Sequence, residues 1–210
     1  MEITKRLFIT TIVGVTVIGA AWHSSGVNAA TREPGGETEL RAAATFADIA
    51  DERQRSVALF SEAARVLTHA RCINCHPAGQ SPLQGEEGSR HEPPVTRGAV
   101  NFGVAGMRCP ACHLDANFDP GNVPGAPHWR LAPIEMTWQG LSHRELCEQL
   151  KDRKRNGDRD LLAIVGHMSD DPLVAWAWAP GGGRAPAPGS QKVFGELIGA
   201  WAESGAACPE

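Results

Sequence analysis

The chain has 210 residues, 42% of them hydrophobic, and a formal net charge of −4 at neutral pH. A mildly acidic chain without a basic cluster argues against nucleic acid and against anionic lipid as partners. Residues 1–29 contain Glu2, Lys5 and Arg6, a net charge of +1, so the remaining 181 residues carry −5. That length corresponds to one domain.

The N-terminus has the three parts of an export signal. Lys5 and Arg6 precede an apolar run from Leu7 to Trp22, and Val27-Asn28-Ala29 places small residues where a signal peptidase reads. We therefore predict a signal peptide over residues 1–29 and a protein that is periplasmic or otherwise exported. Retention as a membrane anchor is the alternative, but the apolar run is shorter than the roughly 20 residues that a span needs. No later segment is apolar enough to cross a bilayer.

Residues 30–45 are predicted as a flexible leader to one domain that covers residues 46–210. From about Ala50 to Ala70 apolar residues recur at helical spacing, and Asp51 can cap the start of that helix. We expect the helix to run directly into the first cysteine motif and to present its two thiols.

Two copies of the pattern Cys-x-x-Cys-His follow. The first consists of Cys72, Cys75 and His76, and the second of Cys109, Cys112 and His113. This pattern is the attachment site of c-type haem: the two thiols bond to the porphyrin, and the adjacent histidine binds the iron. The sequence therefore predicts two covalently bound haem c groups with His76 and His113 as proximal ligands.

The same cysteines allow a second interpretation. Two Cys-x-x-Cys pairs separated by 33 residues could form a four-cysteine zinc site, with a loop somewhat longer than usual. The chain has only 8 histidines, and one of them directly follows each pair. That coincidence favours haem over zinc.

The segments around the motifs, residues 77–108 and 114–140, are rich in glycine and proline, so little regular structure is expected there. Loops of that length without structure need a functional reason. Two haems supply it, because their apolar faces can serve as a surface on which irregular chain packs.

The last third of the chain is more regular. Ser142 and Glu145 form the pattern of a capping box, and we expect that helix to end at Asn156-Gly157. A short helix is expected from Asp158 to about Met168. A terminal helix opens at Ser190 and stops at Gly205. The predicted fold class is mainly α, a small domain of several helices with long loops wrapped around two haems.

Two cysteines lie outside the motifs. Cys147 falls on the helix that follows Ser142, and Cys208 falls in the tail after the terminal helix. In an oxidising compartment a disulfide between them is the economical prediction, with free thiols or an intermolecular bond as alternatives.

The second axial ligand of each iron is not fixed by the motifs. We expect His69, on the helix that feeds the first motif, and His143, within the capping box, not to be ligands. His91 lies in the loop between the motifs and His167 ends an amphipathic helix, and these two rank first as distal ligands. His128 ranks third, and Met136 and Met168 are the fallback, since a thioether would raise the reduction potential.

Much of the chain resembles a group of bacterial exported dihaem cytochromes c that are often labelled as a subunit of isoquinoline 1-oxidoreductase. The resemblance extends from about Leu67 to Pro209. Besides the two motifs, it rests on residues 77–88, 97–98, 106–108, 124–127, 129–133, 138–142, 150–152 and 167–168, and on Trp176 and Trp178. The label implies an association with molybdenum hydroxylases, from which a cytochrome would take electrons. The chain itself has no pattern for a molybdopterin site.

These observations predict an exported single-electron carrier between a periplasmic or membrane dehydrogenase and a downstream acceptor, such as another cytochrome or an oxidase. The chain is accordingly not expected to be an enzyme. One alternative is a dihaem peroxidase, which would keep an open coordination position on one iron. The other is a zinc-stabilised binding module.

Overall fold

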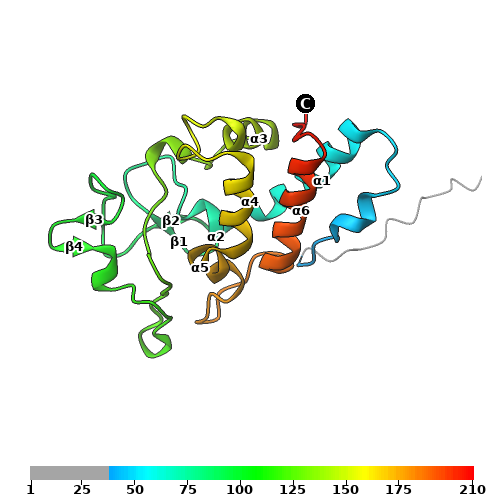
Figure 1. The fold of residues 1–210 in the computed structure, drawn as a ribbon. Helices are drawn as coiled ribbons and strands as arrows, with labels where there is room; N and C mark the ends of the chain where they lie inside the picture. The colour runs from blue at the N-terminus through cyan, green and yellow to red at the C-terminus, as the bar shows by residue number, and fades with distance from the viewer. Residues whose placement is uncertain (1–37) are drawn as a thin grey trace, which may run out of the picture. The chain divides into compact units, whose positions relative to one another are not determined.

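The computed structural model describes residues 38–210, so the predicted signal peptide and residues 30–37 of the predicted leader lie outside it. The expectation of a mainly helical small domain is confirmed in that coarse form (Figure 1). The α-helices are α1 (Glu52–Leu67), α2 (Ala70–Ile73), α3 (His143–Lys151), α4 (Leu161–Asp170), α5 (Pro172–Ala175) and α6 (Gln191–Glu203). The strands are β1 (Leu83–Gln84), β2 (Ser89–Arg90), β3 (Gly103–Val104) and β4 (Met107–Arg108).

The helices begin where short polar side chains can accept from free backbone N–H groups. Asp51 caps α1 by accepting from Gln54, and Ser190 caps α6. Ser142 and Glu145 form both hydrogen bonds of the capping box that opens α3. These starts were all predicted from the sequence.

Three helix boundaries differ from the prediction. α1 ends at Leu67, and a separate turn, α2, carries Cys72, because His69 takes an extended conformation and caps α2 with its own side chain. α3 ends at Lys151 rather than at Asn156-Gly157, since the Asp152 side chain accepts from the backbone of Lys154 and competes with the helix. α4 begins at Leu161, after the Asp160 cap, because Asp158 is left-handed (φ 60°) and cannot start a helix.

Of the predicted leader, the structure describes residues 38–45, and these residues contact the domain. A 3₁₀ turn over Ala43–Phe46 buries Phe46. Arg41 binds the carboxylate of Glu62 on α1 through its backbone N–H and its side chain, and Arg65 binds the same carboxylate. Burial alone would raise the pKa of Glu62, but these hydrogen bonds outweigh it and lower the pKa.

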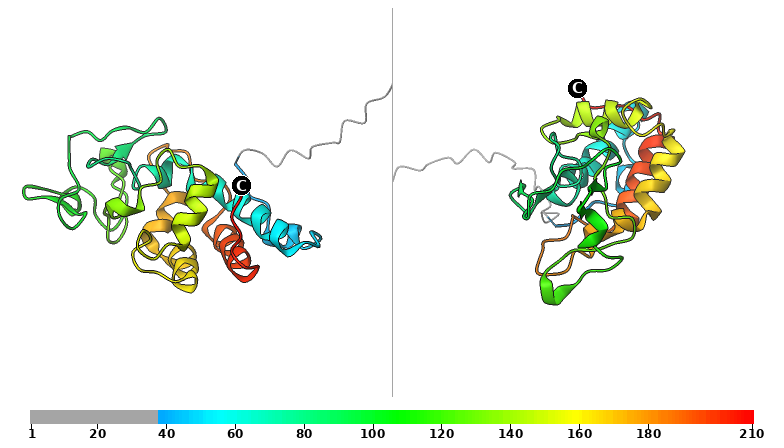
Figure 2. Two further views of the ribbon diagram at one scale, coloured as in Figure 1. Left: turned by 90° about the horizontal axis from the view of Figure 1, so that it is seen from above. Right: turned by 90° about the vertical axis from the view of Figure 1, so that its left-hand side faces the viewer.

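The core lies where α6 packs against both α1 and α4 (Figure 2). Its largest members include Phe60 of α1, which contacts Trp201 of α6 with ring centroids 5.1 Å apart, and Ile164 of α4. α3 adds Leu146 and Leu150, both fully buried. The apolar spacing of these helices explains the arrangement, because each presents one stripe to the others.

A disulfide joins Cys147 of α3 to Cys208 in the tail after α6, the pair expected from the sequence. The tail is also held by hydrogen bonds. The backbone N–H of Ala207 donates to Ser56 Oγ at 2.9 Å, and the Trp201 indole donates to Ala207 O at 3.0 Å.

Residues 74–137 are built differently from the helical part. Among residues 38–210, the core cluster contains no residue between Ile73 and Trp138. The segment consists of loops and of two antiparallel hairpins, β1–β2 and β3–β4, whose strands have two residues each. It also contains short 3₁₀ turns over Cys109–Ala111, Asp119–Gly121 and Ile134–Met136. Within the described residues, no helix has the length and apolar character to cross a membrane.

Candidate functional site

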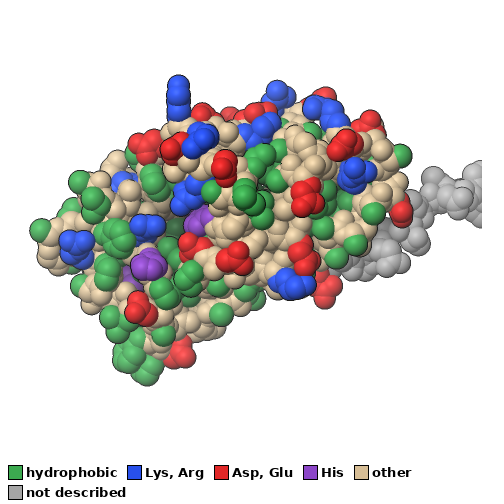
Figure 3. Space-filling view, in the orientation of Figure 1, with side chains coloured by type: hydrophobic (Ala, Val, Ile, Leu, Met, Phe, Trp, Pro, Cys, Tyr) green, Lys and Arg blue, Asp and Glu red, His purple; other side chains and the backbone are tan. Residues whose placement is uncertain are grey.

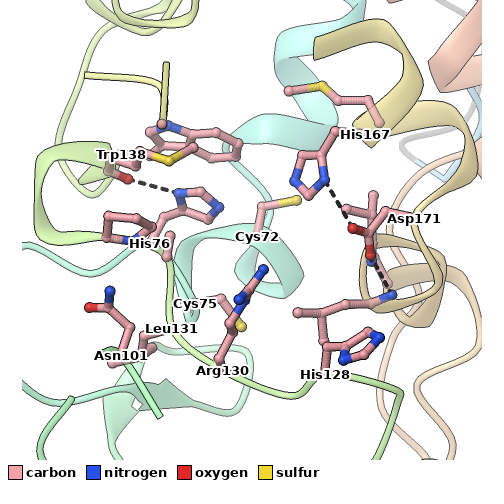
Figure 4. Close-up of a pocket in the computed structure, with 18 of the residues that line it drawn as sticks. Cys72, Cys75, His76, Asn101, His128, Arg130, Leu131, Trp138, His167 and Asp171 are labelled. Atoms are coloured by element: carbon pink, nitrogen blue, oxygen red, sulfur yellow. Dashed lines mark hydrogen bonds and ion pairs between the residues drawn. The ribbon is translucent and has the colours of Figure 1, made fainter. Parts of the chain in front are cut away.

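A cavity of about 350 Å³ lies between the first cysteine motif and α4 (Figure 4). The motif contributes Cys72, Cys75 and His76, and α4 contributes His167 and Met168. On the outer surface, histidine side chains are visible in a hollowed region of the face seen in Figure 3, beside basic and hydrophobic side chains. The cavity has a size typical of sites for small molecules and cofactors.

His76 is fixed on two sides. Its Nδ1 donates to the backbone carbonyl of Met136 at 2.8 Å, and its ring stacks on Trp138 with centroids 3.5 Å apart. Burial lowers the pKa of His76 to about 4, so the ring is neutral at physiological pH. A neutral imidazole with Nδ1–H held by an acceptor leaves Nε2 as a metal ligand.

His167 faces His76 from the other side of the cavity (Figure 4). Its Nδ1 donates to Asp171 Oδ2 at 3.1 Å, which leaves Nε2 free. Burial, followed by opposing effects of Asp171 and of nearby arginines, lowers the pKa of His167. The fallback candidates Met136 and Met168 also line this cavity, and both are buried.

The second motif repeats this arrangement. His113 Nδ1 donates to the carbonyl of Pro124 at 2.7 Å, and its ring stacks on Trp129 with centroids 4.7 Å apart. The ring of His91 lies with its centroid 5.8 Å from that of His113, and His91 Nδ1 donates to the carbonyl of Pro93. A metal–imidazole bond is about 2 Å long, so this separation leaves room for one metal ion between the two rings.

The remaining histidines are placed differently. His69 accepts a hydrogen bond from the backbone of Arg71, and His143 is exposed in the first turn of α3. His128, the third-ranked distal candidate, lines the first cavity but is exposed, in a left-handed conformation (φ 63°). The structure thus brings His167 to the first motif and His91 to the second.

The two motifs are neighbours in space. Burial, and then the adjacent Cys75, raise the pKa of the Cys72 thiol to about 12. Burial and the proximity of Cys109 raise the pKa of the Cys75 thiol to about 11. Cys75 of the first motif therefore lies close to Cys109 of the second, whereas Cys112 is exposed.

No protein-family model, curated protein or solved structure matches the chain. The resemblance to dihaem cytochromes c therefore stays a prediction from sequence. Any function assigned to the protein has to rest on the residues of this chain.

The residues around the first cavity fit a haem group. Arg71 Nε and Trp138 Nε1 are both buried, and neither has a hydrogen-bond partner among the described residues. Both side chains line the cavity. Unpartnered buried donors are costly, and the carboxylates of a haem are acceptors that would satisfy them.

At the second motif the indication is a different one: large apolar side chains close to it in sequence are exposed. Leu114, the residue after His113, is 60% exposed, and Phe118 is 55% exposed. An apolar group of the size of a haem would cover such surface, in a segment that contributes no residue to the core cluster.

A four-cysteine zinc site is the alternative at the same residues. Zinc needs its ligands to converge on one point in tetrahedral geometry. Within residues 38–210, no group of three or more cysteine, histidine or carboxylate side chains converges in that way.

Several functional residues were not found from the sequence. Trp138 stacks on His76 and Trp129 stacks on His113, but each tryptophan is distant in sequence from its histidine. Asp171 accepts from His167 but belongs to no recognisable motif. Only Asp171 had a usable signal, because it lies four residues after His167, where side chains on one helix face meet.

Proposed function

We propose that the protein is an exported dihaem c-type cytochrome that carries single electrons between a donor dehydrogenase and a downstream acceptor. One haem c would be attached to Cys72 and Cys75, with His76 and His167 as axial ligands. The other would be attached to Cys109 and Cys112, with His113 and His91 as axial ligands.

The observation that carries the proposal is the repeated environment of these four histidines. Each donates its Nδ1–H to a fixed acceptor and keeps Nε2 free, and each motif histidine has a second histidine opposite or beside it. Metal-binding histidines are typically held in this manner by an outer acceptor that fixes the tautomer and the ring orientation. Two such pairs, each at a Cys-x-x-Cys-His motif, support two six-coordinate haems.

The chain has the residues that electron transfer requires. A bound haem iron supplies the one-electron chemistry. The histidine pairs would occupy both axial positions and so exclude substrate, and the stacked tryptophans Trp138 and Trp129 hold the rings of His76 and His113 in place. Because Cys75 lies close to Cys109, the two groups would be neighbours, and the exposed Cys112 would bring an edge of the second to the surface.

The same pairing disfavours a dihaem peroxidase, since that reaction needs an open coordination position on one iron. Export is supported by the disulfide, because disulfides persist in oxidising compartments. The donor that the sequence resemblance suggests is a dehydrogenase of the molybdenum hydroxylase type.

The proposal is tested with protein made in a host that matures c-type cytochromes. Mass spectrometry should give the chain plus two haem masses that survive denaturation, and replacing Cys109 and Cys112 by Ala should remove one. The visible and electron paramagnetic resonance spectra should be those of low-spin haem with two nitrogen ligands. A chain without haem adducts, or one that contains zinc instead, would overturn the proposal.

Single substitutions test the assignment of His167 and His91 as the second axial ligands. His167→Ala and His91→Ala should each open one site and give a high-spin signal and carbon monoxide binding at that haem only. His143→Ala is the matched control and should leave the spectrum unchanged, because His143 is exposed on α3. If either distal variant keeps two low-spin haems, the ligand is a different residue, with His128, Met136 and Met168 as the next candidates.

A further inference from the structure

We infer that Asp171 positions His167 and strengthens it as an electron donor to the iron, which lowers the reduction potential of the haem at the first motif. The inference rests on the proposed function and goes beyond it, because it names a residue that tunes the reduction potential of one haem and not of the other.

The Asp171 carboxylate is held on both of its oxygens. As the N-cap of α5, it accepts through Oδ1 from the backbone N–H of Leu173 at 2.8 Å and of Val174 at 3.4 Å. Its Oδ2 accepts from His167 Nδ1 at 3.1 Å. Gln191 of α6 donates to the Asp171 carbonyl, which also fixes the backbone. The same carboxylate therefore both caps α5 and accepts from His167 (Figure 4).

His167 is the only one of the four proposed ligands in residues 38–210 whose Nδ1 bonds to a charged group. The other three donate to neutral backbone carbonyls, those of Met136, Pro124 and Pro93. A hydrogen bond to a carboxylate is roughly twice as strong as one to a neutral acceptor. It also raises the basicity of the ligand.

A more basic imidazole stabilises the ferric iron more than the ferrous iron. A donor protein would reduce each iron by one electron. The Asp171 carboxylate would shift the ferric–ferrous equilibrium of the haem at the first motif toward the ferric form. The Asp171 charge and its hydrogen bond are unchanged in that step. The electron is displaced toward the second haem, which lies at the motif with the exposed Cys112.

Positive charges act in the opposite direction. Arg130 and Arg159 line the same cavity and lie near His167. They are present with or without the carboxylate, so the inference concerns the change that Asp171 makes and not the absolute order of the two potentials.

The test is a spectroelectrochemical titration of the holoprotein and of its Asp171→Asn variant. Asparagine caps a helix about as well as aspartate, so the fold should be kept. We expect the reduction equilibrium of one haem to shift about tenfold toward the ferrous form, about 59 mV for one electron. The other haem should keep its potential, and both should remain low-spin with altered g values at one of them.

Asp170→Asn is the matched control. It removes the same charge one residue away, from an exposed side chain that makes no hydrogen bond to His167 within residues 38–210. The shift in reduction equilibrium should be much smaller in Asp170→Asn than in Asp171→Asn. An equal shift in the two variants would show that only the general field matters, and no shift in Asp171→Asn would show no role for the carboxylate; either result overturns the inference.

A third variant covers the case in which Asp171→Asn does not fold. Asp171→Glu keeps the charge, so its potential should stay closer to that of the wild type. If the reduction equilibrium of one haem in Asp171→Glu shifts tenfold or more toward the ferrous form, the inference is also overturned. Failure of the proposed function is a separate result, since a wild-type protein with no attached haem would give no titration at all.

Discussion

Removal of the disulfide between Cys147 and Cys208 tests the energetics of the fold. The bond closes a loop with a sequence separation of 61 that contains α4, α5 and α6. The chain-entropy expression for a loop of that length gives about 14 cal/mol/K, or about 4 kcal/mol at 25 °C. We expect reduction to lower the free energy of unfolding by that amount and the melting temperature by about 8–16 °C.

The loss should arise mainly in the unfolded state. The tail keeps its hydrogen bonds to Ser56 and Trp201 when the sulfur–sulfur bond is cut, so the folded state changes little. The measurement is denaturant unfolding of the same protein with and without a thiol reductant. Reduced protein retains both sulfur atoms, whereas the double alanine variant also loses buried volume at Cys147 and should be less stable still. Free energies of unfolding that differ by less than about 1 kcal/mol between the oxidised and reduced proteins would refute the loop-entropy argument.

Two further predictions concern a buried carboxylate and a close backbone approach. Because hydrogen bonds from its two arginines lower the pKa of Glu62, this group contributes stability above its unfolded pKa of about 4.3, and the contribution is lost as pH falls through the folded value. Glu62→Gln should therefore have a lower free energy of unfolding in urea than the wild type at pH 7. Between pH 7 and pH 3.5 the variant should lose less of this free energy than the wild type does; parallel curves of unfolding free energy against pH would contradict this. Gly125→Ala should loosen the loop that carries the His113 acceptor, because a Cβ there would collide with the backbone oxygens of Leu114 and Ala116. We expect mixed spin states at one haem only, and an unchanged spectrum would argue against it.

The sequence predicted the helical part well because its signals are local. The caps at Asp51, Ser142 and Ser190 and the apolar stripes of α1 and α6 depend on residues only a few positions apart. Boundaries were missed where a side chain offered the backbone another partner, as at His69 and Asp152. The packing of residues 38–45 was missed because it depends on Glu62, which is distant in sequence.

The candidate site was predictable to the extent that its chemistry lies in contiguous residues. The two motifs and the ranking of His91 and His167 above His128 came from the sequence, and the structure places these histidines near the motif histidines. The ring stacking of Trp138 on His76 and of Trp129 on His113 could not be foreseen. It depends on how loops without a repeating pattern fold back across long stretches of chain.

The core cluster of the helices contains no residue between Ile73 and Trp138, and this has a consequence for how the protein is made. The helices on either side can bury their own apolar faces and be cross-linked as soon as the chain reaches an oxidising compartment. The intervening segment buries far fewer apolar side chains, chiefly Ala126, Leu131 and Met136. On the proposed function, its order of assembly is set by haem attachment, so a chain that has not yet received haem would be cut by proteases between the motifs while its helical part stays intact.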